Sequence, residues 1–212
     1  MARLSAFADT FEAMRSRGSV TIDGRLEVYD GGDKVQTVTT LSVRAEGHPG
    51  HTQFSVLHYA EDGVDKTAEA RHKAPRPGGV VGVGRSPRDA KPLRIPILAR
   101  DEPLYTFDIV EVDRADPARL RIAFAPKRRA DDTIEGSAWV DSRTGALISV
   151  AFKLDKTPTF VDFVHVIVEF GAPTSMGPAI SNVRIDGAGG FLFFRKRFHG
   201  TATFSDYSIA AP

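Results

Sequence analysis

The sequence contains no cysteine among its 212 residues. Disulfide bonds, thiolate metal sites and cysteine nucleophiles are therefore excluded, as is the cysteine that would carry a lipid anchor within this chain. The absence of cysteine is compatible with export from a bacterial cell, although it does not establish export.

The chain also has a formal net charge of only +1 and no long apolar run. Lys and Arg number 28 against 27 Asp and Glu, so no overall field favours nucleic acid or a membrane as a partner. No apolar run reaches the roughly 18 residues of a membrane span, and the opening stretch MARLSAFADTFEAM has no apolar signal core. The protein is either cytosolic or exported with a signal that precedes residue 1.

Motifs of catalysis and metal binding are not recognisable either. The stretch GVGRS at 82–86 lacks the lysine of a phosphate-binding loop, and His48 and His51 have no further ligands at zinc spacing. The serine at the start of 205–207 lies near His199 in sequence but has no nucleophile elbow. We therefore expect no catalytic residue, no metal and no cofactor, and an enzyme is the least favoured class.

Alternation of apolar and polar residues with period two is abundant, and it predicts strands separated by short turns. The alternating segments are 19–30, 34–47, 51–60, 104–113, 119–127, 133–141, 146–156, 160–170, 177–189 and 190–209. About ten or eleven strands are expected in total. Sequential strands with short connections favour an antiparallel meander.

Three segments depart from this alternation. Residues 3–16 carry one apolar stripe at helical spacing and are predicted to form a helix. Residues 64–73 allow a helix or a strand, and a strand is preferred. Residues 74–103 are rich in proline and glycine, and 71–100 is basic, so we expect a long loop that is either a lid over a cavity or a solvated connection.

The segment FVDFVHVIVEF, residues 160–170, is apolar on both faces of the predicted strand. Its two faces carry Phe160, Val164, Val166, Val168 and Phe170 on one side, and Val161, Phe163, His165 and Ile167 on the other. An antiparallel strand commonly has one wet face and one buried face. Two interpretations stay open: covering layers on both sides, or one face that lines a cavity.

The C-terminal half resembles the outer-membrane lipoprotein-sorting family, the LolA/LolB-like proteins of Gram-negative bacteria. The strand ending Trp139-Val140-Asp141 is followed by a turn with Thr144-Gly145, and a late strand closes on Asp206-Tyr207. An N-terminal helix before a long run of strands adds to the likeness. The resemblance extends loosely over most of the chain and is best over 104–207.

The resemblance implies a half-open β-barrel whose concave side, covered by helices, encloses an apolar cavity for acyl chains of lipoproteins or lipids. It also implies a location in the periplasm or at the outer membrane. The sequence itself also indicates that the sheet has more apolar surface than the predicted helix can cover. A helix covers a strip ~10 Å wide, whereas ten strands spaced ~4.8 Å apart span ~50 Å before the sheet curls.

We therefore predict one domain over 1–212: a mainly β, curved antiparallel sheet with an N-terminal helix on its concave face. The function expected is lipid or lipoprotein binding and transport by a monomer that also contacts other envelope proteins. The predicted cavity residues are Leu4, Phe7, Phe11, Met14, Phe152, Val164, Val166, Val168 and Phe193. The alternative is an envelope protein-interaction or sensor module of the same fold with a self-filled cavity.

Overall fold

The computed structural model describes residues 13, 14, 16–73, 93–98, 100–157, 159–175, 177–191 and 194–210. The strands are β1 (Gly18–Tyr29), β2 (Val35–His48), β3 (His51–Glu61), β4 (Val64–Asp65), β5 (Tyr105–Val112), β6 (Arg119–Pro126), β7 (Ile134–Asp141), β8 (Leu147–Leu154), β9 (Val161–Thr174), β10 (Gly177–Phe191) and β11 (Phe194–Ile209). A helix α2 (Thr67–Lys73) and a short 3₁₀ turn η1 (Glu102–Leu104) precede β5. The predicted mainly β architecture is confirmed.

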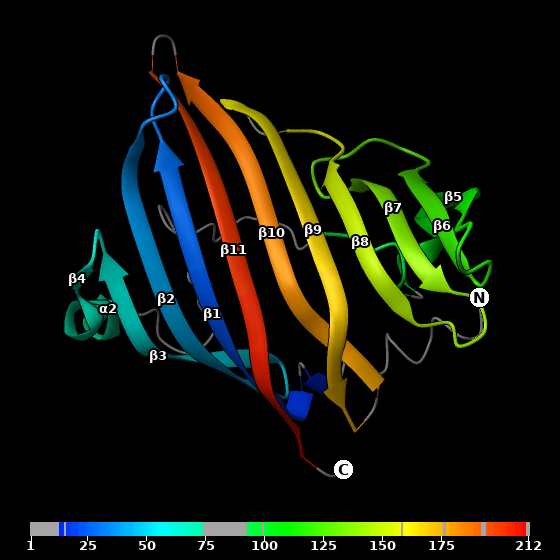
Figure 1. Cartoon of the computed structure of the whole chain (residues 1–212), viewed down its shortest axis with the longest axis horizontal. Helices are drawn as coiled ribbons and strands as arrows, with labels where there is room; N and C mark the ends of the chain where they lie inside the picture. The colour runs from blue at the N-terminus through cyan, green and yellow to red at the C-terminus, as the bar shows by residue number, and fades with distance from the viewer. Residues whose placement is uncertain are drawn as a thin grey trace.

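All eleven strands form one open antiparallel sheet in the order β4-β3-β2-β1-β11-β10-β9-β8-β7-β6-β5 (Figure 1). Most neighbours follow one another along the chain. The exception is the seam between the first and the last strand, in which Gly18 pairs with Ile209 and Tyr29 pairs with Arg197. The seam joins two meanders, β1–β4 and β5–β11, into a single sheet.

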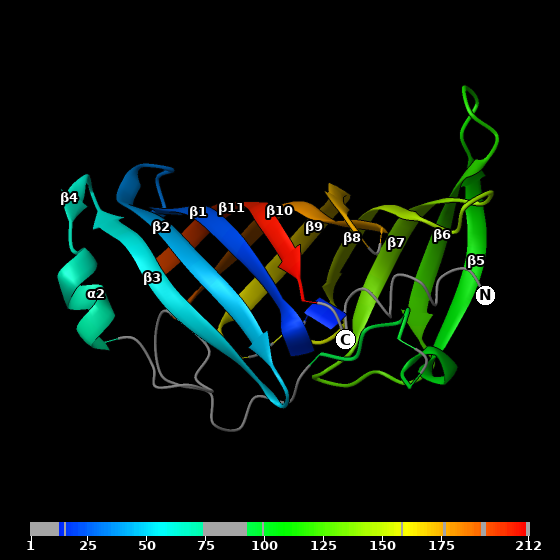
Figure 2. The same cartoon turned by 90° about the horizontal axis from the view of Figure 1, so that it is seen from below.

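The sheet bends into an open arch, which is seen end-on in Figure 2. Ala13, Met14, Ser16 and Arg17 are helical and lie inside the arch. The rest of the predicted helix 3–16 lies outside the described residues, so its covering of the concave face stays a prediction. Among the described residues, no helix has the length and apolar character that crossing a bilayer requires.

The segment 93–104 closes the concave side of β5–β8. Its Ile97 packs against a cluster formed by Ala138, Val140 and Leu147, and a second cluster unites Tyr105, Phe124 and Ile134. The hydroxyl of Tyr105 donates to the carbonyl of Arg94 at 2.9 Å. Burial raises the pKa of this hydroxyl, which keeps it a donor. One part of the described core therefore lies on β5–β8, and further buried residues such as Val20, Val43 and Ala45 lie on β1 and β2.

The prediction of a strand over 64–73 is wrong beyond Asp65, because Thr67–Lys73 form α2. The carboxylate of Asp65 accepts the backbone N–H of Thr67 at 2.7 Å, which satisfies one of the free donors at the start of the helix. Hydrogen bonding to Thr67 also holds the pKa of Asp65 below its usual range. The residue propensities of this segment are compatible with a helix or a strand, and the hydrogen bond from Thr67 to Asp65 favours the helix.

The Trp139–Gly145 motif, which contributed to the family resemblance, forms the tight turn between β7 and β8. The carboxylate of Asp141 accepts the backbone N–H of Arg143 at 2.8 Å and its guanidinium at 3.1 Å. These bonds lower the pKa of Asp141 to about 2. Gly145 has a φ of 74°, a left-handed conformation that glycine adopts without strain. The motif therefore has a structural role.

We expect this turn to contribute an acid-sensitive part of the stability. The folded pKa of Asp141, about 2, lies below the reference value of 3.8, so its contribution is complete above pH 3.8 and is lost as the pH falls through about 2. Asp141→Asn should lower the urea midpoint near neutral pH, and the difference from wild type should shrink on acidification. A difference that is independent of pH would contradict the charge-based explanation.

Candidate functional site: the concave apolar face

The strand register determines which side chains share the inner surface of the arch. The segment that leads into β5 lies on the concave side in Figure 2, and its Ile97 packs against the cluster of Ala138, Val140 and Leu147. Ala138 is paired with Val150, and Val150 with Val168, so these side chains point the same way. Extending the pairing across the sheet defines the concave apolar face: Ile22, Leu26, Val28, Leu41, Val150, Phe152, Val164, Val166, Val168, Val183, Ile185, Phe198, Ala202 and Phe204.

The residues named for the concave apolar face are half-buried, whereas Val43, paired with Ile22, and Ala138, paired with Val150, are fully buried on the same side of the sheet. The fully buried positions lie mostly under segment 93–104 or near the start of β1. The centre of the sheet therefore keeps part of its inward apolar surface accessible. An apolar surface of this kind in a soluble protein commonly marks a ligand or partner site.

The convex face has the opposite character. Directly paired residues form a continuous row of ionisable side chains across six strands: Glu27, His199, Asp186, His165, Lys153 and Glu135. Within this row, Asp186 lies 2.6 Å from Nδ1 of His199, and Lys153 lies 2.8 Å from Glu135. The two faces thus separate into an apolar interior and a charged exterior.

The difference between the two faces explains why β9 is apolar on both sides. Val164, Val166 and Val168 point into the arch, opposite Gly187, Ile185 and Val183 in that order. Phe163 lies on the convex face, beside the ring of His165 at 5.3 Å, and is 36% exposed. The outer apolar side chains of β9 are accommodated among the ionisable groups of the convex face.

The structure brings four of the predicted site residues together. Phe152 is paired with Val166, and Val164 and Val168 follow on the same face of β9. Met14 lies beside Gly18 at the start of β1. The remaining predicted residues, Leu4, Phe7, Phe11 and Phe193, lie outside the described residues. Participation of any of these residues in ligand binding remains a prediction.

Sequence reasoning missed the contributions of β1, β10 and β11. Ile185, Phe198, Ala202 and Phe204 extend the concave apolar face beyond β9. The alternation that places three of them on one face is visible between residues 198 and 204. Its inward direction follows only from the pairing of β11 with β1, which local sequence does not reveal.

Glycines let neighbouring side chains lie flat on the inner surface. The ring of Phe198 occupies the space above Gly187, where an added Cβ would come within 2.1 Å of Cζ. In the same way, Cγ2 of Ile185 would lie 2.6 Å from a Cβ at Gly200. The inner surface is therefore continuous at these positions.

A pocket of about 470 Å³ touches two predicted site residues, Phe152 and Val166. Its full lining is Phe124, Ala125, Glu135, Gly136, Ala151, Phe152, Lys153, His165, Val166 and Ile167. The volume falls in the range of small-molecule sites, and most of the lining side chains are apolar. Glu135, Lys153 and His165 in this lining belong to the row on the convex face, so the pocket is not a cavity within the concave apolar face.

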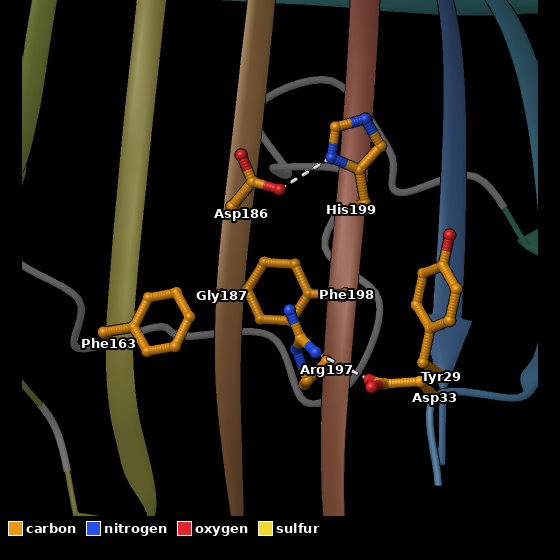
Figure 3. A pocket seen from close by; sticks show the side chains of 8 residues that line it. All are labelled: Tyr29, Asp33, Phe163, Asp186, Gly187, Arg197, Phe198 and His199. Carbon is orange, nitrogen blue, oxygen red and sulfur yellow. Dashed lines mark hydrogen bonds and ion pairs between the residues drawn. The ribbon is translucent and has the colours of Figure 1, made fainter. Parts of the chain in front are cut away.

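A second pocket of about 350 Å³ lies among β9, β10, β11 and β1 (Figure 3). Its ionisable side chains already have partners, since Arg197 lies 2.6 Å from Asp33 and Nδ1 of His199 lies beside Asp186. At its edge, the hydrogen bond from Tyr29 holds the pKa of Glu27 below its usual range. Because these charges satisfy one another, the pocket is a weaker candidate than the concave apolar face.

Comparison with known proteins finds similarity only among solved structures. No family model and no curated protein matches the sequence. Among solved structures, the chain is similar to a LolA superfamily protein from Nitrosomonas europaea, with 10% identity and a TM-score of 0.43, over 98% of this chain and 93% of that one. It is also similar to a putative outer membrane lipoprotein-sorting protein domain from Vibrio parahaemolyticus, with 10% identity and a TM-score of 0.47, over 97% and 91%.

A third similar structure is the MucA/MucB complex of Pseudomonas aeruginosa, with 9% identity, a TM-score of 0.30 and full coverage of both chains, 100% each. At these identities the function has to be argued from the residues of this chain. The names of the first two structures belong to the family that the C-terminal half of this sequence resembles.

Proposed function

We propose that this is a non-enzymatic binding protein of the bacterial envelope, located in the periplasm or at the outer membrane. It holds an acyl chain of a lipid or lipoprotein against the concave apolar face and takes part in lipid or lipoprotein transport. The observation that supports this proposal is the contrast between the two faces of one sheet. The inner face is apolar and half-buried, whereas the outer face carries ion pairs.

Burial of an acyl chain can supply enough free energy for binding. Burying one methylene contributes about 0.8 kcal/mol, so about ten methylenes supply about 8 kcal/mol. Association costs at least about 4 kcal/mol in lost freedom, which leaves room for reversible binding. Reversibility is what a transport protein requires, because the guest has to be released.

The test is lipid retention by Val166→Trp. The indole would occupy the inner surface between Phe152 and Ile185, the two residues paired with Val166. We expect native mass spectrometry to detect lipid on the wild-type protein purified from a bacterial host, and little or none on the variant. Palmitate titration by calorimetry should show the same loss.

Thr201→Trp is the matched control, because Thr201 is exposed on the convex face in the adjacent part of the sheet. Its lipid content should equal that of the wild type. Ala202→Trp, one residue further along on the concave face, should reproduce the loss and guards against a local folding defect. Folded wild-type protein that neither carries lipid nor binds palmitate would refute the carrier function and favour the interaction module.

A further inference from the structure

The two edge strands of the open sheet differ in length and in what covers them. This difference concerns a function separate from acyl-chain binding. At one end, β4 has only two residues and the chain turns at once into α2. At the other end, β5 is an eight-residue strand with no strand beyond it among the described residues. An exposed strand edge is a template for pairing with another chain.

Helix α2 blocks the first edge by bonding to the outward backbone of β3. Arg71 donates through Nε to the carbonyl of Val56 at 2.8 Å and through its terminal nitrogen to the carbonyl of Leu57 at 3.0 Å. The hydroxyl of Thr67 accepts the backbone N–H of Tyr59 at 2.9 Å. The part of this edge from 56 to 61 is therefore closed to a further strand by α2 and β4.

The edge at β5 has no comparable protection. At the start of the strand, the backbone N–H of Tyr105 donates to the carbonyl of Glu102. Beyond Tyr105, in the part of the chain that the structure describes, no hydrogen bond joins the outer side of β5 to another segment. Ile109, Val110 and Val112 are 64%, 51% and 50% exposed. The strand contains neither Lys nor Pro, the residues that commonly protect such edges, and its one irregularity is a bulge between Ile109 and Glu111.

The side chains of β5 specify the chemistry of an added strand. Phe107, Ile109 and Val112 are paired with apolar residues of β6 and continue the concave side. Asp108 and Glu111 are the charged residues of β5 and belong to the convex side. Glu111 has Arg121 at 2.9 Å, whereas Asp108 is paired with an alanine of β6. A strand placed beside β5 would therefore be favoured by basic residues on one face and apolar residues on the other.

We propose that β5 is a docking edge for an extended segment of a partner protein in which basic and apolar residues alternate. The charges argue against a second copy of this chain as the occupant. The symmetric pairs of β5 strands that have the longest overlap and keep apolar residues together put Asp108 opposite Glu111 or opposite its own copy. Like charges in directly opposed positions destabilise strand pairing.

The test uses the whole chain and a blocked, fluorescent peptide in which Lys and Val alternate. We expect it to bind and to protect backbone amides of β5 from hydrogen exchange. A peptide with Glu in place of Lys should bind about tenfold more weakly because of charge. A Lys/Val peptide with methyl groups on alternate backbone nitrogens should lose binding, because it cannot complete the strand ladder.

In the protein, the double change Asp108→Lys and Glu111→Lys should weaken the Lys/Val peptide about tenfold while strengthening the Glu peptide. Val166→Trp should leave peptide binding unchanged, so failure here is distinguishable from failure of the acyl-chain proposal. Equal binding of the methylated peptide would overturn the proposal, since it would indicate charge attraction without strand pairing. Protection of β5 that increases with protein concentration in the absence of peptide would also overturn it, in favour of a second copy.

Discussion

Replacing Gly136 by alanine is expected to lower the free energy of unfolding by about 3 kcal/mol, the upper end of overpacking costs. An added Cβ at this position would lie 2.0 Å from the carbonyl oxygen of Ala151 and 2.7 Å from Cα of Phe152. Both atoms belong to the backbone of β8, which cannot rotate away as a side chain can. Strand β8 would have to move away from β7, and the core cluster around Ile134 and Phe124 would open with it.

Gly24→Ala is the matched control on the same concave side. The nearest atoms to its added Cβ are backbone oxygens of Thr201 and Leu41 at 3.7 and 3.9 Å, ordinary contact distances. We expect a change within about 0.5 kcal/mol in urea unfolding. If the two variants were equally stable, the close approach of β8 to Gly136 would be wrong.

Asp155→Ala is expected to cost about 2–3 kcal/mol, the range for hydrogen bonds to buried charged groups. The residue is 5% exposed. Its carboxylate accepts the hydroxyl of Thr133 at 3.2 Å and Nε of Arg129 at 3.0 Å. The backbone N–H of Asp155 also donates to the carbonyl of Thr133 at 3.0 Å. The backbone and the carboxylate of Asp155 together therefore join the end of β8 to the start of β7. Thermal and urea unfolding measure the loss.

A second carboxylate in the same region provides the comparison. Asp131 forms an ion pair with Lys156 at 2.9 Å, but its side chain is 82% exposed. Exposed ion pairs contribute between about 0 and 1 kcal/mol, so Asp131→Ala should leave the midpoint nearly unchanged. A loss for Asp131→Ala as large as that for Asp155→Ala would show that burial does not control the contribution of these carboxylates.

The strands were predictable because alternation is a local property. Segments such as 19–30 and 34–47 need no information from elsewhere to identify them as strands, and both are found as β1 and β2. The segment 64–73 was not predictable in this way. Its helical state depends on the cap at Asp65 and on the contacts of Arg71 with the edge of β3, which exist only after β3 has formed.

Local sequence also could not predict which face of β9 points into the arch. Strand β9 offers apolar side chains on both faces, and Phe163 is as hydrophobic as Val164. The choice is made by the neighbours: Val166 is paired with Phe152 and Ile185, whereas His165 is paired with Lys153 and Asp186. Pairing partners far apart in sequence decide which apolar set faces inward.

The seam between β1 and β11 has a consequence for the order of assembly during synthesis. β11, the partner of β1, is translated after all the other described strands, and Gly18 pairs with Ile209. Until the ribosome releases that segment, β1–β4 form an isolated meander with a bare strand edge at β1. The edge of β1 is therefore open to mispairing while β2–β10 are being translated, and protection by a holding chaperone would matter most at that stage.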